Sequence, residues 1–112
     1  MKRGEVWTLR DDGYAAKARP VVIVQSDPGE VFDSVVLCLF TTFESDNIPT
    51  RIRIAPDDKN GLLKDSYVMT EKIVTVSKNE LGVRIGELQD MQMHSISAGL
   101  AAVLDIHKED LE

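Results

Sequence analysis

The sequence has a single cysteine, Cys38, so no intrachain disulfide can form. That is typical of a protein from a reducing compartment. Long apolar runs are also missing: the longest, Val21–Val24 and Val35–Phe40, fall far short of the roughly 20 residues of a membrane span. No apolar segment follows the N-terminal Met1, which argues against a signal peptide. We therefore expect a cytoplasmic protein.

Positive charge is scarce. The 112 residues include 13 basic and 19 acidic ones, for a net charge of −6, which by itself argues against nucleic-acid binding. The charge is distributed unevenly, however. Residues 1–20 and 51–78 each carry a net charge of +2, whereas residues 21–50 and 79–112 each carry −5. This pattern is compatible with a locally basic groove on an acidic body, and equally with a mixed, solvated surface.

The sequence lacks the common motifs for metals, phosphate loops and thiol nucleophiles. His94 and His107 lie far apart along the chain and have no cysteine pair beside them. None of the seven glycines belongs to a GxxxxGK[ST] or GxGxxG pattern. We interpret Cys38 as a core residue, because the apolar run VVLCLF around it raises the pKa of a thiol. We therefore expect no metal ion and no other cofactor.

The apolar and turn residues predict one small domain over residues 1–112 that is mainly β. A chain of this size, with 43% apolar residues, can bury one core without a metal or disulfide. Strands are predicted at Glu5–Leu9, Val21–Val24, Ser34–Thr41, Arg51–Ile54, Tyr67–Met69 and Ile73–Val76, with a further short strand or tight turn in Glu80–Gly86. Short strands joined by turns are typical of a small, strongly bent barrel.

The hydrophobic period becomes helical from about Gln89. The apolar positions with this spacing are Met93, Ile96, Leu100, Val103 and Leu104. They predict one amphipathic helix to about Ile106, which would close one open end of the barrel. Gly99 is a weak point in it, costing about 1 kcal/mol relative to alanine. The polar tail His107–Glu112 is expected to fray.

Polar side chains stand at the ends of two strands predicted to be buried. Arg19 lies just before Val21–Val24, and Thr41 ends the strand Ser34–Thr41. If these strands pair antiparallel, Arg19 and Thr41 lie near one another. A guanidinium beside a hydroxyl can bind a phosphate oxyanion, although ordinary strand-end side chains would give the same pattern. The alternation RIRI puts Arg51 and Arg53 on one strand face.

A set of landmarks runs in order along nearly the whole chain, from Arg3 to about Leu104. They are Lys2–Trp7, Arg19–Val24, the strand ending in Thr41-Thr42, the loop around Pro49, Ser66–Val68, Glu71–Val76 and Leu88 followed by a helix. This ordered set resembles the MazF/PemK/Kid ribonuclease toxins of type II toxin–antitoxin systems. The resemblance implies an SH3-like, partly open barrel, of the plasmid-maintenance-toxin type, with a C-terminal helix, acting as a homodimer.

The resemblance also implies an activity and partners. It implies metal-independent, sequence-specific cleavage of single-stranded RNA, with mRNA as the expected target, which inhibits translation and growth. The products would be a 2′,3′-cyclic phosphate, or 3′-phosphate, and a 5′-hydroxyl. A MazE-like antitoxin would fill the RNA groove with one of its segments, and DNA would be contacted only through that antitoxin.

Carried over to this sequence, the resemblance assigns active-site roles to Arg19 and Thr41, and Glu71 falls where some members have an acidic residue in the site. The chemistry agrees. Attack of the RNA 2′-hydroxyl on its own phosphorus adds negative charge to the phosphoryl oxygens, which Arg19 and Thr41 can stabilise. Glu71 is the general base to test, unless it is a solvated turn carboxylate. Lys17, Thr42, Arg51 and Arg53 are expected to contact RNA phosphates. The alternative is that they are ordinary surface residues.

Several features depart from the family pattern. The loop Arg10–Ala18 is shorter than in many members, so a sequence preference for RNA cannot be carried over. Met69 stands where some members have a functional arginine, and Trp7 is interpreted as a core residue rather than a base-stacking platform. The alternative functions are a non-enzymatic, CcdB-like gyrase poison on the same fold and an inert SH3-like binding module. The pair Arg19 and Thr41 favours the enzyme, because a gyrase binder has no need of it.

Overall fold

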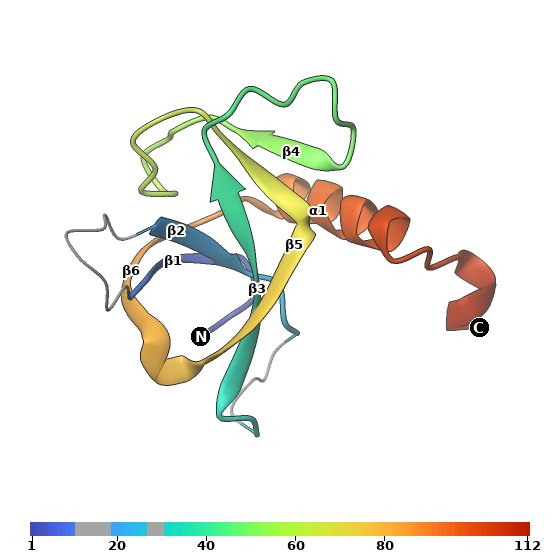
Figure 1. Cartoon of the computed structure of the whole chain (residues 1–112), viewed down its shortest axis with the longest axis horizontal. Coiled ribbons are helices and arrows are strands. Elements are labelled where there is room, and N and C mark those ends of the chain that lie inside the picture. The colour runs from blue at the N-terminus through green and yellow to red at the C-terminus, as the bar shows by residue number, and fades with distance from the viewer. Residues whose placement is uncertain (11–18, 27–30) are drawn as a thin grey trace.

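One antiparallel sheet and one long helix make up the fold in the computed structural model, which describes residues 1–10, 19–26 and 31–112 (Figure 1). The elements are β1 (Glu5–Leu9), β2 (Arg19–Ile23), β3 (Ser34–Thr41), β4 (Arg51–Ile54), β5 (Ser66–Ser77), β6 (Leu81–Glu87) and α1 (Asp90–Val103), with short 3₁₀ helices at Lys78–Glu80 and Lys108–Leu111. β1, β3 and β4 have the predicted bounds. β2 begins earlier than predicted, at Arg19.

The six strands form a single bent sheet in the order β4-β5-β3-β2-β1-β6, and every neighbouring pair is antiparallel. β4 and β6 are the two edges of the sheet, so the barrel is open between them. Figure 1 shows the bend, with α1 and the C-terminus extending to one side. The predicted class, mainly β with a C-terminal helix, is confirmed. No helix among the described residues is long and apolar enough to span a membrane.

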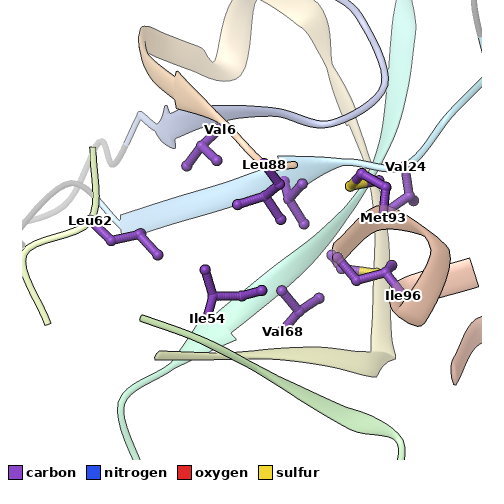
Figure 2. Close-up of a cluster of buried hydrophobic side chains, with 10 residues drawn as sticks. Val6, Val24, Ile54, Leu62, Val68, Leu88, Met93 and Ile96 are labelled. Atoms are coloured by element: carbon purple, nitrogen blue, oxygen red, sulfur yellow. The ribbon is translucent and has the colours of Figure 1, made fainter. Parts of the chain in front are cut away.

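Apolar side chains cover both faces of the sheet, because the strand residues alternate in direction. One cluster lies against α1 and comprises Val6, Val22, Val24, Cys38, Ile54, Leu62, Val68, Leu88, Met93 and Ile96. Figure 2 shows Met93 and Ile96 of the helix turned toward the strand side chains. The second cluster comprises Val21, Ile23, Val35, Leu37, Val76 and Leu81, with Trp7 packed against it. Burial raises the pKa of Cys38 to about 11, which agrees with a core role.

β5 is one continuous strand, whereas the sequence predicted two separate strands, Tyr67–Met69 and Ile73–Val76. The pairing of β5 with β3 shifts in register between Cys38 and Leu39. This shift leaves residues 70–72 of β5 as a bulge. The polar residues that suggested a break in the sequence therefore lie within the bulge.

The helix is shorter than predicted. α1 begins at Asp90, near the predicted start, but ends at Val103 rather than at Ile106. Asp105 adopts a φ of 55°, in the left-handed region, which turns the chain out of the helix. The tail that was expected to fray forms the short 3₁₀ helix Lys108–Leu111.

Gly99 marks a close contact between α1 and the sheet. A Cβ added to Gly99 would lie 2.9 Å from Thr70 Cγ2 and 3.1 Å from the carbonyl oxygen of Thr50. These two groups are held together, because the buried Thr70 hydroxyl donates a 2.6 Å hydrogen bond to that carbonyl. We expect Gly99→Ala to lower the free energy of unfolding by about 1–3 kcal/mol, although alanine is the better helix former.

Urea denaturation measures this effect. The exposed Ala98→Gly in the same helix should lose only the propensity difference of about 1 kcal/mol. An unchanged or higher stability for Gly99→Ala would contradict the close packing of α1 on Thr70.

Candidate active site

The sheet places Thr41, Tyr67 and Arg53 in one row across β3, β5 and β4, and Arg19 begins the neighbouring β2. Thr41 pairs with Tyr67, and Tyr67 pairs with Arg53. The β2–β3 pairing ends at Val21 and Leu39, and its register, continued by two residues, would set Arg19 opposite Thr41. Side chains directly opposite each other point to the same face, with Cα atoms about 4.5–5.5 Å apart. In the continued register, Arg19 and Thr41 would share one face of the sheet.

Arg19 is the cation beside this row that is available to bind an anion. Arg19 is exposed and is the first residue of β2, where it pairs with Leu9 of β1. Within the described ranges, no hydrogen bond or ion pair engages the Arg19 guanidinium. Its planar fork of donors can therefore bind two oxygens of a phosphate at once.

The Thr41 hydroxyl is held with its proton free to be donated. Its oxygen accepts a 3.1 Å hydrogen bond from the backbone N–H of Phe43. A hydroxyl has one O–H donor besides its acceptor sites. No described group accepts that proton, so the Thr41 O–H can donate to a phosphoryl oxygen next to Arg19.

Glu71 is brought to Arg51 rather than to Arg19. Arg51 Nη2 lies 2.5 Å from Glu71 Oε2, and Arg51 Nε lies 3.1 Å from the same oxygen. This guanidinium lowers the pKa of Glu71 below its ordinary value, against a smaller opposing effect of burial. The Glu71 carboxylate is therefore ionised at neutral pH, but it is a weaker base than a free glutamate.

Arg53 forms a second ion pair at the edge strand. Its Nη2 lies 2.8 Å from Asp65 Oδ2, and both side chains are more than half exposed. Thr42 is also exposed, just beyond the end of β3. Lys17, the remaining predicted phosphate contact, lies outside the described residues. Because Arg51 and Arg53 both have carboxylate partners, part of the positive charge predicted for this face is offset.

Three residues that were not predicted as site residues fix the loop between β3 and β4. The Tyr67 hydroxyl donates a 2.7 Å hydrogen bond to Asp46 Oδ1, and this carboxylate raises the pKa of the phenol. Ser45 is fully buried, and its hydroxyl accepts a hydrogen bond from Arg51 Nη1 at 3.2 Å. These partners lie far apart in the sequence and form no motif, so only the fold brings them together.

Met69, which stands where some family members have a functional arginine, has an arginine on the neighbouring strand. Met69 pairs with Arg51 on β4 and with Leu39 on β3. An arginine therefore occupies the position opposite Met69 on the adjacent strand, and its guanidinium binds Glu71. Trp7 donates from Nε1 to Glu5 Oε1 and packs against an apolar cluster, which agrees with its interpretation as a core residue.

No metal centre is visible in the described ranges 1–10, 19–26 and 31–112. There, no group of three or more His, Cys, Asp or Glu residues is arranged to hold a metal ion. His107 pairs with Asp105 in the exposed C-terminal tail.

Comparison with known proteins decides the family. Residues 2–104 match the model of the PemK-like, MazF-like toxin of type II toxin–antitoxin systems. The chain belongs to this PemK/MazF family. It is 36% identical over 107 residues to a probable endoribonuclease MazF of Mycolicibacterium smegmatis, covering 95% of this chain and 98% of the relative. It is 33% identical to an endoribonuclease MazF of Staphylococcus saprophyticus, covering 96% and 93% of the two chains.

Solved structures of PemK/MazF proteins share the fold. A mycobacterial endoribonuclease in complex with its cognate antitoxin superposes with a TM-score of 0.80 at 32% identity, covering 96% of this chain and 97% of that one. A Deinococcus radiodurans MazF from a MazE–MazF complex has a TM-score of 0.75 at 13% identity, which shows the fold alone.

Proposed function

We propose that this protein is a toxin that cleaves single-stranded RNA, with mRNA as its target, and thereby inhibits translation and growth. Family membership makes it a MazF-type endoribonuclease of a toxin–antitoxin system. One observation supports the proposed site: the β2–β3 register, continued from Val21 and Leu39, would bring Arg19, which has no side-chain partner among the described residues, opposite Thr41. The family match favours this reading over a CcdB-like gyrase poison or an inert binding module.

The reaction follows from what these two groups can donate. The 2′-hydroxyl oxygen attacks the adjacent phosphorus, the bond from phosphorus to the 5′-oxygen breaks, and the leaving oxygen takes up a proton. The products are a 2′,3′-cyclic phosphate and a 5′-hydroxyl. Arg19 and Thr41 donate to the non-bridging oxygens, where negative charge grows in the transition state. This chemistry requires no metal ion.

Glu71 acts through Arg51 in this proposal, rather than as the general base. The ion pair lowers its basicity and orients the Arg51 fork on the face that carries Thr41. We expect Glu71→Gln to reduce cleavage by no more than about tenfold, because a full general base contributes roughly 10²–10⁴. Arg51→Ala should give a similar loss, and neither variant should move the acidic limb of the pH–rate profile.

Cleavage rates between pH 4 and pH 9 measure this prediction. A loss above about 10²-fold in Glu71→Gln alone, with the acidic limb abolished, would restore Glu71 as the base. The same variant has a stability readout. A carboxylate whose pKa is lowered by folding stabilises the fold above its unfolded pKa, and this contribution is lost as the pH falls through the lower folded value. The stability difference between the wild type and Glu71→Gln should therefore shrink below about pH 4.5.

Arg53 is proposed as a phosphate contact, together with Lys17, Thr42 and Arg51. Its exposed ion pair with Asp65 is weak enough for a phosphate to replace it. We expect Arg53→Ala to weaken the binding of an RNA analogue without reactive 2′-hydroxyls and to reduce the salt dependence of log K by about 0.7, the value for one phosphate of a single strand. Fluorescence anisotropy at several salt concentrations measures both quantities.

Arg84→Ala is the control, since Arg84 pairs with Glu5 and Glu87 on the opposite edge. Equal slopes for both variants would contradict the assignment.

The proposed partners are single-stranded RNA, a MazE-like antitoxin and a second copy of the chain in a cytoplasmic homodimer, with DNA reached only through the antitoxin. A solved relative is described as an endoribonuclease in complex with its cognate antitoxin, which supports the second of these. Light scattering tests the dimer, for which we expect about twice the chain mass of 12.5 kDa. The mass of one chain at micromolar concentration would contradict it.

Incubation of the purified protein with several long single-stranded RNAs in EDTA tests the proposed activity. We expect discrete cuts at a repeated sequence. Intact RNA at low salt would contradict the enzyme, and cleavage only after a divalent metal is added would contradict the metal-independent mechanism.

A further inference from the structure

An exposed aromatic ring stands at the end of β3, immediately beyond the proposed catalytic hydroxyl. Phe43 is 73% exposed and belongs to neither apolar cluster of the fold. It follows Thr41 by two residues, so the two Cα atoms are at most about 7 Å apart. Figure 1 shows the connection from β3 to β4 at the top of the view, beyond the ends of the strands.

The backbone of Phe43 is fixed on both sides. Its N–H donates to Thr41 Oγ1 at 3.1 Å, and its carbonyl oxygen accepts a 2.8 Å hydrogen bond from the hydroxyl of Ser45. Ser45 is itself fully buried and bound by Arg51. A large apolar side chain on a clamped backbone is pre-organised to bind, because little conformational entropy remains to be lost.

We propose that Phe43 is a stacking platform for a nucleobase next to the phosphate that Arg19 and Thr41 hold. This inference rests on the proposed ribonuclease function. Single-stranded RNA offers unpaired bases, and aromatic side chains bind these by stacking in a largely sequence-tolerant way. The hydrogen bond from the Phe43 N–H to the Thr41 hydroxyl links the two groups. One backbone segment therefore carries both the ring that binds the base and the hydroxyl that binds the phosphate.

The site favours a base over other apolar partners because of its surroundings. Thr41 and Arg53 lie in one row across β3, β5 and β4, and Arg19 begins the neighbouring β2, so candidate phosphate-binding groups stand close to the end of β3 that leads into Phe43. A nucleotide joins a flat apolar base to an anionic phosphate within one residue, which matches an exposed ring two residues from a hydroxyl donor, with an arginine that has no described partner at the start of the neighbouring strand. A protein segment that packed on the Phe43 ring would need only the apolar contact, and not the phosphate-binding arginine and hydroxyl.

The test compares four variants at position 43 in the full-length protein: Phe43→Ala, Phe43→Leu, Phe43→Tyr and Phe43→Trp. The probe is a single-stranded RNA that the wild type cleaves, together with the same RNA carrying a 2′-deoxy nucleotide at the cut, which cannot react. We expect Phe43→Ala and Phe43→Leu to bind the unreactive RNA about tenfold more weakly, within the range for loss of one stacked base. Phe43→Tyr and Phe43→Trp should bind within about twofold of the wild type, because both keep a stacking ring.

Two further readouts separate stacking from a merely structural role. Phe43→Ala should raise KM with little change in kcat, since stacking acts equally on the substrate and the transition state. The indole introduced by Phe43→Trp should be quenched when RNA binds, beyond any change at Trp7 seen in the wild type. Phe32→Ala is the matched control, because Phe32 is 57% exposed and precedes the opposite end of β3.

Each outcome decides for or against the platform. RNA binding by Phe43→Ala at the level of the wild type and of Phe32→Ala would overturn it, and weaker self-association in the same variant would assign the ring to a protein interface instead. A binding loss in Phe43→Leu as large as in Phe43→Ala supports it, whereas full recovery by leucine would overturn a role for the aromatic ring. If the wild type neither binds nor cleaves RNA, the ribonuclease proposal itself fails. If the wild type cleaves while Phe43→Ala binds normally, only the platform fails.

Discussion

Replacing Arg19 by alanine is expected to lower the RNA cleavage rate by at least about 10³-fold, the scale for removing an arginine or oxyanion donor from a phosphoryl transition state. Arg19 is exposed and without a described partner, so its loss should leave the fold intact. The loss should appear mainly in kcat, because Arg19 interacts most strongly with the negative charge that grows on the phosphoryl oxygens in the transition state. Single-turnover cleavage of a short RNA measures it.

Two variants control this prediction. Arg19→Lys keeps the charge but not the planar fork, and we expect it to recover only part of the rate. Arg84→Ala removes another exposed arginine, paired with Glu5 on the far edge of the sheet, and should cleave like the wild type. Cleavage by Arg19→Ala within about tenfold of the wild type would remove Arg19 from the site.

The second large effect is expected from Thr41→Ala, which should slow cleavage by about 10²–10³-fold, the scale for one donor to a developing oxyanion. The same change removes the acceptor for the N–H of Phe43 and loosens the loop that follows. Thr41→Ser keeps both the O–H donor and the acceptor, and it should stay within about tenfold of the wild type. Separate kcat and KM values for the two variants measure the contribution of the hydroxyl.

Thr75→Ala serves as the control for the loss of a strand hydroxyl. Thr75 is exposed on β5 and pairs with Val36, away from the row that contains Thr41. Equal activity of Thr41→Ala and Thr75→Ala would show that the hydroxyl at position 41 plays no part in the reaction.

The sequence was sufficient to predict most of the sheet, because the hydrophobic pattern of each strand is local. The alternation RIRI defined β4, and the run from Ser34 to Thr41 defined β3. The same local reasoning predicts that Arg19 lies near Thr41, since antiparallel pairing brings the start of one strand to the end of the next. The sequence predicts two strands in place of β5, because residues 70–72 are polar and polar residues between apolar runs usually indicate a turn. In the structure these residues form a bulge.

The remaining features of the site depend on partners that are distant in the sequence. Glu71 was predicted as a base because its residue type suits proton transfer, but the fold places it against Arg51, twenty residues away. The hydrogen bond from Tyr67 to Asp46 likewise joins two segments that no local pattern connects. The proposed stacking role of Phe43 depends on the exposure of its ring and on the hydrogen bonds that hold its backbone, and no sequence motif indicates either of these.

The central claim is that the RNA 2′-hydroxyl is the nucleophile and that Arg19 and Thr41 stabilise the phosphate it attacks. Mass spectrometry of the fragments from a short RNA cleaved in EDTA tests this claim most directly. We predict a 5′ fragment ending in a 2′,3′-cyclic phosphate and a 3′ fragment beginning with a 5′-hydroxyl, with both fragments formed much more slowly by Arg19→Ala and Thr41→Ala. Fragments with a 3′-hydroxyl and a 5′-phosphate would contradict it, because those ends come from attack by water rather than by the RNA itself.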